Sequence, residues 1–354
     1  MTDILPFLKS LLSIPGVSGF EAPAAGLIEN EWQPLVDELS LSRLGSVHGL
    51  KKGSGAEPRP AIMLACHMDS IGLMVSKVEN GFLRITPIGG IDPRILPGQA
   101  VTVHAKDGDL PGIIVMPPPA LLPDDVGRGT VDTAHLFVDV GLLPLKVARL
   151  VRIGDAVSFA TEAVEMSGET LSGHSLDNRA SVAAVTLCLQ ELTSKSHTWD
   201  VIAVATVQEE RSGVGAATST FQIKPDLGIA IDVTFAKGPG ANDWQSFPLG
   251  KGPTLGHGPN MHPFLHKKFK ALAERLEIPY GIEFLPRSSG TDGMPMQVTA
   301  EGLPVFVLSI PIRYMHTPVE MVALKDIHRA GRLLAEFVAG LEADFMHTIT
   351  WDEA

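Results

Sequence analysis

The sequence predicts an α/β protein: a sheet covered by helices on both faces, into which a small β-barrel or β-sandwich is inserted. Strand-like apolar runs alternate with helical patterns towards both ends of the chain, as in such a sheet. Between residues 71 and 165 helical periodicity largely vanishes, and short β-like runs alternate with glycine and proline. The 354 residues also exceed the size at which one core usually stops growing. We therefore expect a discontinuous larger domain, residues 1–70 and 166–354, and an inserted β-rich domain, residues 71–165.

The N-terminal segment is expected to hold two helices and one central strand. Apolar residues recur at helical spacing over residues 4–12 and again over residues 24–35. The short apolar run 61–66 is typical of a buried strand, and His67 follows it directly.

The middle segment is expected to form short strands joined by turns, with one short helix at residues 144–150. The strand-like runs cover residues 83–85, 100–103, 112–115, 136–140 and 156–159.

The last part of the chain returns to alternating strands and helices. The expected helices are residues 178–192, 262–276 and 319–345, and the expected strands are residues 201–207, 227–231 and 305–310. Ligands of such sheets gather beyond the carboxyl ends of strands. His67, Glu209, Glu210 and Asp232 each follow a strand run, so the sequence predicts a site there.

Composition excludes several classes of function. The formal net charge is −12 and no basic run is present, which argues against nucleic acid and anionic membranes as partners. Cys66 and Cys188 lie in apolar runs and are expected to be core thiols rather than a disulfide. We expect a cytoplasmic protein, because no secretory signal or apolar stretch of membrane-spanning length is visible.

His67 and Asp69 have two interpretations. An isolated His-x-Asp is more often a hydrogen-bonded histidine at a strand end. In a metal site, His67 would be a ligand, and Asp69 would accept the proton of its other ring nitrogen or bind the metal itself. Asp177 is equally ambiguous, because aspartate at a helix start is a preferred cap and a carboxylate can also give one oxygen to each of two metals.

Glu209 and Glu210 end an apolar strand, where two carboxylates are costly unless a cation or a reaction uses them. Neighbouring side chains point in different directions, so one would bind metal and the other would act as general base. Asp232 is either a turn aspartate or a ligand of one metal. His316 is either a loop histidine or a ligand of the other metal. Nitrogen and carboxylate ligands without thiolate suit Zn²⁺, Co²⁺ or Mn²⁺.

The ordered set of these motifs resembles the tetrahedral aminopeptidases, the glutamyl aminopeptidase or cellulase M-type metallopeptidases. The matching segments span nearly the whole chain: His67–Asp69, residues 88–93 and 96–98, 176–179, 207–210, 230–233, Ser289–Asp292 and 309–320. Two departures stand out. Residues 211–216 read RSGVGA where the family usually has valine, glycine and then a basic residue, and His174 stands where lysine is frequent.

The resemblance implies a role for each residue of the predicted site. His67 and Asp232 would hold one metal, Glu210 and His316 the other, and Asp177 would bridge the two ions. Glu209 would be the catalytic base, and Asp69 would orient His67.

The resemblance also implies a fold and an assembly. The fold would be a peptidase-type α/β/α sandwich with a mixed sheet. The inserted domain would serve oligomerisation and access to the site, through dimers and a hollow dodecamer.

These observations together predict an aminopeptidase that hydrolyses N-terminal residues from peptides through a metal-bridging hydroxide, with Glu209 as general base. Two divalent cations per subunit are expected, Zn²⁺ first, with Co²⁺ or Mn²⁺ as alternatives. The rival interpretations are a glycoside hydrolase of endoglucanase type and a non-catalytic assembly or binding protein. The preferred N-terminal residue stays open, since Arg287 or Arg313 would select acidic side chains only by pointing inward. The segment Gly290–Asp292 is either a turn or part of the active-site lining.

Overall fold

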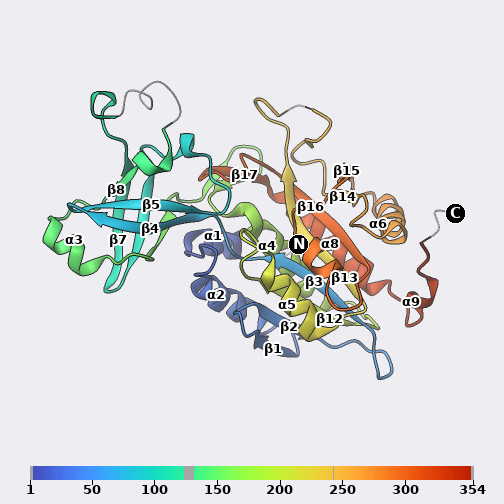
Figure 1. Ribbon diagram of the computed structural model, residues 1–354. Coiled ribbons are helices and arrows are strands. Elements are labelled where there is room, and N and C mark those ends of the chain that lie inside the picture. Colours follow the sequence, from blue (N-terminus) through green and yellow to red (C-terminus); the bar gives the residue numbers. More distant parts are fainter. Residues whose placement is uncertain (1–2, 123–130, 242, 352–354) are drawn as a thin grey trace.

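The computed structural model describes residues 3–122, 131–241 and 243–351, and in it the chain forms two bodies of unequal size (Figure 1). The larger body is a mixed α/β sheet covered by helices. The smaller body is a closed antiparallel β-barrel, which lies to one side of the sheet in Figure 1. The predicted fold class, an α/β sandwich with an inserted β-barrel, is therefore confirmed.

Eleven strands of the described chain form the large sheet. Its main path is β1 (Glu38–Leu41), β2 (Val47–Lys51), β12 (Asp200–Thr206), β3 (Ala61–His67), β13 (Leu227–Phe235), β16 (Val305–Arg313), β17 (Glu320–Ala323), β11 (Thr170–Gly173) and β10 (Val164–Met166). Off this path, β14 (Thr254–His257) pairs with β16, and β15 (Gly281–Phe284) pairs with β14. The central strands β12, β3, β13 and β16 are parallel neighbours. They are almost wholly apolar because helices cover both of their faces.

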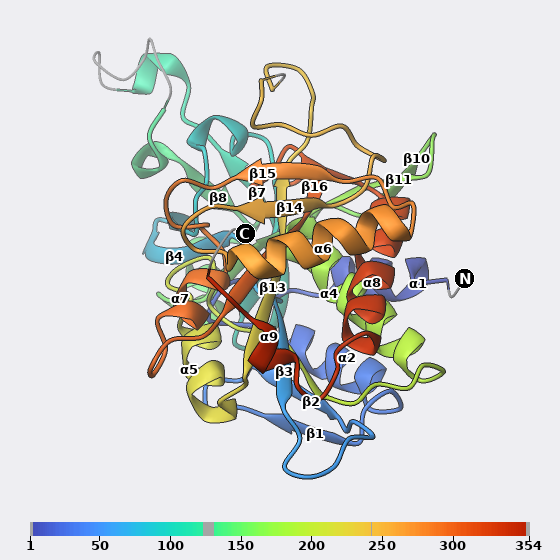
Figure 2. The same ribbon diagram turned by 90° about the vertical axis from the view of Figure 1, so that its right-hand side faces the viewer.

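Helices lie on both faces of the sheet (Figure 2). One face carries α1 (Leu5–Ser13), α2 (Ala22–Trp32), α4 (Leu176–Leu192) and α8 (Leu324–Ala339). The other carries α5 (Val214–Ile223) and α7 (Gly293–Gln297), while α6 (Pro263–Arg275) packs against α8 and β14. A last short helix, α9, covers Phe345–Thr348. The long buried face of α4 holds the helix against β3 and β13, and this contact places the start of α4 at the sheet edge.

The barrel closes in the order β4 (Gly72–Glu79), β5 (Phe82–Ile88), β8 (Phe137–Asp139), β7 (Gly108–Val115), β6 (Ala100–Ala105) and β9 (Ala156–Phe159). Its alternating inward residues make a separate core that includes Val75, Val101, Val103, Ile114 and Val157. The predicted helix 144–150 is present as α3 (Pro144–Leu150). Short 3₁₀ turns cover Pro93–Ile95, Pro119–Leu121 and Thr133–His135.

One expected element is wrong. We expected a single helix over residues 319–345, but the segment contains three elements: β17, then α8, then α9. Strand β17 pairs with β11 and β16, so its backbone is fixed by the sheet rather than by local helical preference. Pro318 is consequently followed by a strand, and the helix begins only at Leu324. The unanticipated elements are the strands β1, β2, β4, β10, β11, β14 and β15 and the helices α5 and α7.

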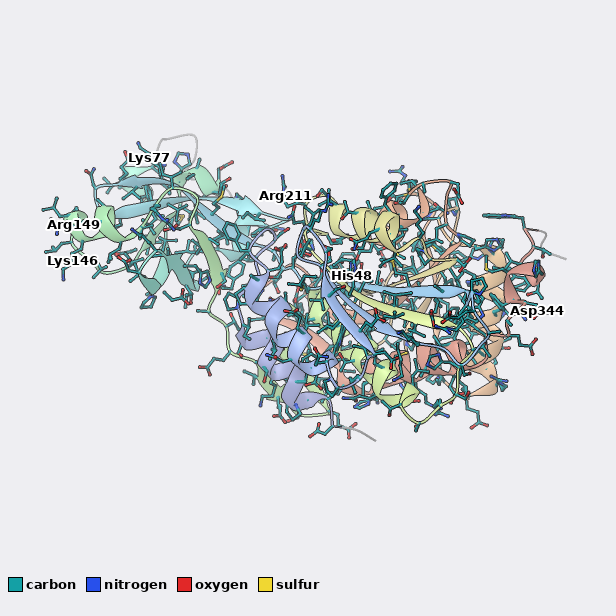
Figure 3. The ribbon with its side chains drawn as sticks, turned by 90° about the horizontal axis from the view of Figure 1, so that it is seen from below. His48, Lys77, Lys146, Arg149, Arg211 and Asp344 are labelled. Carbon is teal, nitrogen blue, oxygen red and sulfur yellow. The ribbon has the colours of Figure 1, made fainter. Side chains whose placement is uncertain are left out.

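The described residues contain no helix long and apolar enough to cross a membrane. Cys66 and Cys188 are both free and buried, as expected. In Figure 3, Lys146 and Arg149 lie at the far end of the barrel and Asp344 lies at the opposite end of the molecule.

Candidate metal centre

Parallel pairing brings the polar residues of several strands to one edge of the sheet. His67 is the last residue of β3, and Glu209 and Glu210 lie in the loop that follows β12. Because β12 and β3 run parallel and Thr206 is paired with His67, the two strands end side by side. The site thus lies where an open α/β sheet normally binds its ligand.

Asp232 lies within a strand rather than after one. We expected the strand to end at residue 231, but β13 continues to Phe235. Ala230 is paired with Ala65, so two residues further along both strands Asp232 comes to lie beside His67. The interpretation of Asp232 as a turn aspartate is therefore wrong.

Asp177 connects the two histidines. It lies at the start of α4 with non-helical dihedral angles, φ −79° and ψ 101°, so the regular helix begins only after it. One carboxylate oxygen, Oδ1, is 3.2 Å from His67 Nε2, and the other, Oδ2, is 3.3 Å from His316 Nε2. The helix-cap interpretation of Asp177 is thus wrong.

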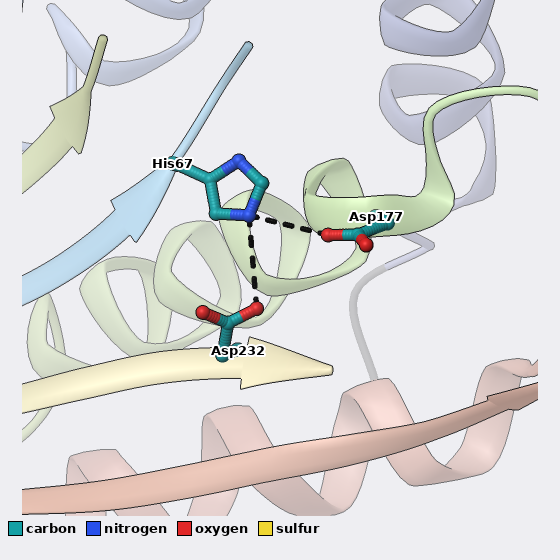
Figure 4. Close-up of side chains that lie close together, drawn as sticks. All are labelled: His67, Asp177 and Asp232. Carbon is teal, nitrogen blue, oxygen red and sulfur yellow. Dashed lines mark ion pairs between the residues drawn. The ribbon is translucent and has the colours of Figure 1, made fainter. Parts of the chain in front are cut away.

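Two groups of possible metal ligands share Asp177. The first is His67, Asp177 and Asp232, shown in Figure 4, and the second is Asp177, Glu210 and His316. Within each group the ligand atoms all lie within 4.8 Å of one another. In the second group His316 Nε2 is 3.4 Å from Glu210 Oε2.

Main-chain carbonyls orient both imidazole rings. His67 Nδ1 donates to the carbonyl of Asp69 at 3.2 Å, and His316 Nδ1 donates to the carbonyl of Gly90 at 2.8 Å. A carbonyl only accepts, so in the neutral ring the proton is on Nδ1 and Nε2 keeps a lone pair. Both Nε2 atoms face carboxylate oxygens, which is the arrangement that a bound cation requires.

The carboxylate of Asp69 lies beside His67 and also bonds the loop that carries the two glutamates. Its Oδ1 is 3.5 Å from His67 Nδ1, but its two oxygens accept the main-chain N–H groups of Glu209 and Glu210, at 3.0 and 3.1 Å. Asp69 is fully buried, so these bonds are shielded from water. It therefore fixes the loop that carries the two glutamates.

The site holds more buried negative charge than the positively charged side chains around it balance. Burial raises the pKa of Glu209 to about 9, and burial together with the Asp177 charge raises that of Glu210 to about 10. Glu210 Oε1 is buried without a hydrogen-bond partner among the described residues. Burial also raises the pKa of Asp232. A set of carboxylates this costly fits divalent cations, which would balance the charge and bind the orphaned oxygen.

The pKa values of the two histidines and of Asp177 all shift in the direction that favours the charged form. Burial alone lowers the pKa of His67, but the surrounding carboxylates, Glu209 first, raise it well above its usual value. A hydrogen bond to Asp177 likewise raises the pKa of His316. Burial raises the pKa of Asp177, but the hydrogen bonds from both histidines outweigh burial and lower it.

A buried glutamate and a buried arginine complete the surroundings, and no role for either had been anticipated. Glu320 Oε1 accepts the N–H of His316 at 2.9 Å, and its Oε2 accepts the N–H of Asp177 at 3.1 Å. Arg179 is also fully buried and donates to the main-chain carbonyl of Ile14 at 2.5 Å and to those of Leu11 and Met68. Burial lowers its pKa to about 10, while the charges of Asp69 and Glu320 raise it. No signal in the sequence singled out Glu320, because its segment was expected to be a helix.

The segment Gly290–Asp292 divides into two parts. Gly290 and Thr291 line a cavity of about 540 Å³ that also contains the two groups of possible ligands, together with Arg211 and Met315. Asp292 lies behind that wall, where its Oδ2 accepts a hydrogen bond of 2.5 Å from Thr206 Oγ1. Burial raises the pKa of Asp292 to about 7. His174 lies edge-on to Phe159, with 5.0 Å between ring centroids, and belongs to neither group of possible ligands.

The backbone is strained where it presents these residues. Ser175, Gln208, Tyr314 and His316 have positive φ values of 69°, 58°, 60° and 60°. Non-glycine residues in this region cost about 1–3 kcal/mol each and persist only where the surrounding structure enforces them. Their positions next to Asp177, Glu209 and His316 indicate that the site, not local preference, sets these conformations.

The chain matches known proteins over nearly its whole length. Residues 45–333 match the family model described as M42 glutamyl aminopeptidase. The lysyl aminopeptidase of Pyrococcus furiosus is 37% identical over 331 residues, which cover 92% of this chain and 94% of that protein.

Solved structures of aminopeptidases are also similar to this chain over nearly its whole length. A TET aminopeptidase from a marine sediment Thaumarchaeota archaeon has a TM-score of 0.92 at 28% identity, covering 98% of this chain and 99% of that one. The TET1 peptidase of Pyrococcus horikoshii, described as assembling into a tetrahedron or a large octahedral shell, has a TM-score of 0.84 at 28% identity. The match covers 96% of this chain and 100% of that chain.

Proposed function

The chain belongs to the M42 glutamyl aminopeptidase family and is a metal-dependent aminopeptidase, and from that premise we propose that peptides lose their N-terminal residue at the site around Asp177. The observation that carries the proposal is the position of Asp177, whose two oxygens lie 3.2 and 3.3 Å from the Nε2 atoms of two different histidines. One carboxylate that serves two ligand groups is what a pair of cations requires.

The ligands divide between two positions. His67 and Asp232 would hold one cation, Glu210 and His316 the other, and Asp177 both. Their donor set of nitrogen and oxygen without sulfur fits Zn²⁺ first, with Co²⁺ or Mn²⁺ as alternatives. Bound divalent cations would supply Lewis acidity, which lowers the pKa of water and polarises a carbonyl.

Glu209 is proposed as the general base. It is the glutamate that belongs to neither ligand group, yet its Oε2 lies 3.8 Å from His67 Nε2. The N–H of Glu209 is held by Asp69, so its carboxylate is positioned before substrate arrives. Glu209 would take the proton of the attacking water and give it to the departing amine.

The barrel is proposed as a separate domain, residues 71–165, that serves self-association. Leu143, Leu145 and Ile153 around α3 are exposed at 73%, 77% and 69%, and exposed apolar side chains of this kind mark interaction surfaces. By analogy with the shell-forming TET1 peptidase, the chain would form dimers and a hollow assembly. The mass of the particle in solution tests this; a monomer at all concentrations would contradict it.

One experiment tests the enzymatic proposal. Protein stripped with a chelator is supplied with Zn²⁺, Co²⁺ or Mn²⁺ and assayed on free and N-acetylated aminoacyl-p-nitroanilides. We expect metal-dependent hydrolysis of the free forms only, since an aminopeptidase needs the N-terminal amine.

Each rival interpretation predicts another result. A glycoside hydrolase would cleave a β-glucan oligosaccharide after stripping, and its two carboxylates need no metal. A binding protein would take up the cations without turnover. Either outcome would overturn the proposal.

A further inference from the structure

A second cavity opens beside the candidate metal centre. It has a volume of about 290 Å³ and shares four lining residues with the larger cavity: Val233, Gly290, Thr291 and Met315. The two spaces are therefore adjacent. A cavity of this size is too small for a peptide and suits one side chain.

Most of its wall is apolar. Four aromatic side chains line it, namely Phe235, Trp244, Phe247 and Phe284, and Leu285 adds an aliphatic surface. Such a wall favours a long aliphatic or aromatic stem and excludes a short polar group. Aromatic faces also attract cations.

Glu283 is the exception, and the only charged side chain among the described residues that line this cavity. It comes from β15, which pairs with β14 at the margin of the sheet (Figure 2). Its Oε1 accepts the hydroxyl of Thr234 at 2.5 Å and its Oε2 that of Thr254 at 2.8 Å. None of the ion pairs found in the described part of the chain includes Glu283.

This arrangement leaves the buried carboxylate of Glu283 able to accept a further hydrogen bond. A carboxylate has about four acceptor positions, and the hydroxyls of Thr234, Thr254 and Ser309 fill three of them. Burial raises the pKa of Glu283, and the hydroxyls of Thr234, Thr254 and Ser309 oppose that shift only in part. A buried anion without a cation is costly, and a cationic ligand would remove that cost.

We propose that this cavity receives the side chain of the substrate's N-terminal residue and that Glu283 makes the enzyme prefer a basic residue, lysine or arginine. The inference rests on the aminopeptidase function proposed above and names its substrate class. The aromatic wall packs against the aliphatic stem, and Glu283 binds the ammonium or guanidinium group at its end.

The opposite preference, for an acidic residue, lacks a partner in this cavity. Neither Arg287 nor Arg313 lines it. Arg313 Nε donates to the main-chain carbonyl of Lys237 at 2.6 Å, so its guanidinium is engaged elsewhere. An acidic side chain would meet only the like charge of Glu283.

The test compares two substrates that differ only in the terminal charge. Lysyl- and norleucyl-p-nitroanilide are assayed on metal-loaded enzyme, together with arginyl and glutamyl substrates. We expect kcat/KM for lysine to exceed that for norleucine by at least about 30-fold, the range for a buried charge pair. In Glu283→Gln the ratio should fall to within about threefold of unity. Because each ratio is taken within one protein sample, partial loss of folded enzyme cancels.

Glu301→Gln, at an exposed glutamate away from the cavity, serves as the matched control and should keep the wild-type ratio. A wild-type preference for norleucine or glutamate, or an unchanged ratio in Glu283→Gln, would overturn the inference and leave the aminopeptidase function standing. If none of the aminoacyl substrates is hydrolysed with any metal, the proposed function itself fails.

Discussion

Asp69 and Glu320 perform the same structural task at two places in the candidate metal centre. Each is a buried carboxylate whose two oxygens accept two main-chain N–H groups: Asp69 holds Glu209 and Glu210, and Glu320 holds Asp177 and His316. Hydrogen bonds from a charged acceptor are stronger than neutral ones. Asp69 therefore holds the loop of the two glutamates next to the end of β3, and Glu320 holds the His316 loop next to the start of α4.

Glu209→Gln should remove turnover and keep the metals. An amide cannot take a proton from water, and the loss of a general base lowers kcat by about 10²–10⁴-fold. Glu209 belongs to neither ligand group, so the variant should bind two cations per chain by elemental analysis. An unchanged kcat would remove Glu209 from the mechanism, whereas loss of metal would make it a ligand.

Asp177→Asn should weaken both metal positions, while Asp232→Asn should weaken only one. Asp177 is the residue that the two ligand groups share, and an amide is a poorer ligand for a divalent cation than a carboxylate. Elemental analysis after dialysis at low metal concentration should find less than one cation per chain in the first variant and about one in the second.

The same two variants should differ in how much added metal stabilises the folded protein. A cation at 100 times its dissociation constant stabilises the wild type by about 2.7 kcal/mol per site, so the thermal midpoint should rise when Zn²⁺ or Co²⁺ is added to stripped protein. The rise should nearly vanish in Asp177→Asn. Equal rises in both variants would show that Asp177 is not shared.

Glu320→Gln should lower metal affinity although Glu320 is in neither ligand group. The amide has one accepting atom where the carboxylate has two, so either Asp177 or His316 loses the acceptor for its N–H. An unsatisfied buried donor costs about 1–3 kcal/mol, and loss of a partner that orients ligands costs about 10–100-fold in metal affinity. Calorimetric titration with Zn²⁺ measures this, and the exposed Glu342→Gln is the control. Wild-type affinity in Glu320→Gln would contradict it.

Local pattern was enough to predict most of the sheet and the polar residues at its edge. Residues 61–66, 201–207 and 305–310 are apolar except for Thr206 and Ser309, because they are buried on both faces, and that property is visible in the chain itself. The convergence of His67 and Glu209 follows from parallel pairing alone. Which Asp177 oxygen faces which histidine could not be predicted, since that depends on how α4 packs across β3 and β13.

The errors have a common cause, which is that sheet pairing overrode local preference. Strand β17 carries Glu320 and lies in a segment that reads as helix, but its main chain is bonded to β11 and β16. Strand β13 runs past residue 231 because β16 continues beside it as far as Ile312. Partners distant in sequence decide both outcomes, so a single chain without its pairing does not reveal them.

His48 provides a prediction about acid stability that is independent of the metal centre. It lies in β2 within the larger body (Figure 3), and its Nε2 is 2.9 Å from Ser219 Oγ. Burial lowers its pKa from 6.5 to about 4, so between those pH values the unfolded chain binds a proton that the folded chain does not. The contribution of His48 to the free energy of unfolding is therefore intact above about pH 6.5. It falls as the pH decreases towards 4, by about 3 kcal/mol in total.

The variant His48→Gln tests this. Glutamine can still bond Ser219 but does not titrate, so the free energy of unfolding of the variant should fall less than that of the wild type between pH 7 and 4.5. Thermal midpoints of stripped wild-type and variant protein over that range measure the difference, with the exposed His347→Gln as control. Parallel pH curves for wild type and His48→Gln would mean that the pKa of His48 is the same in the folded and unfolded protein.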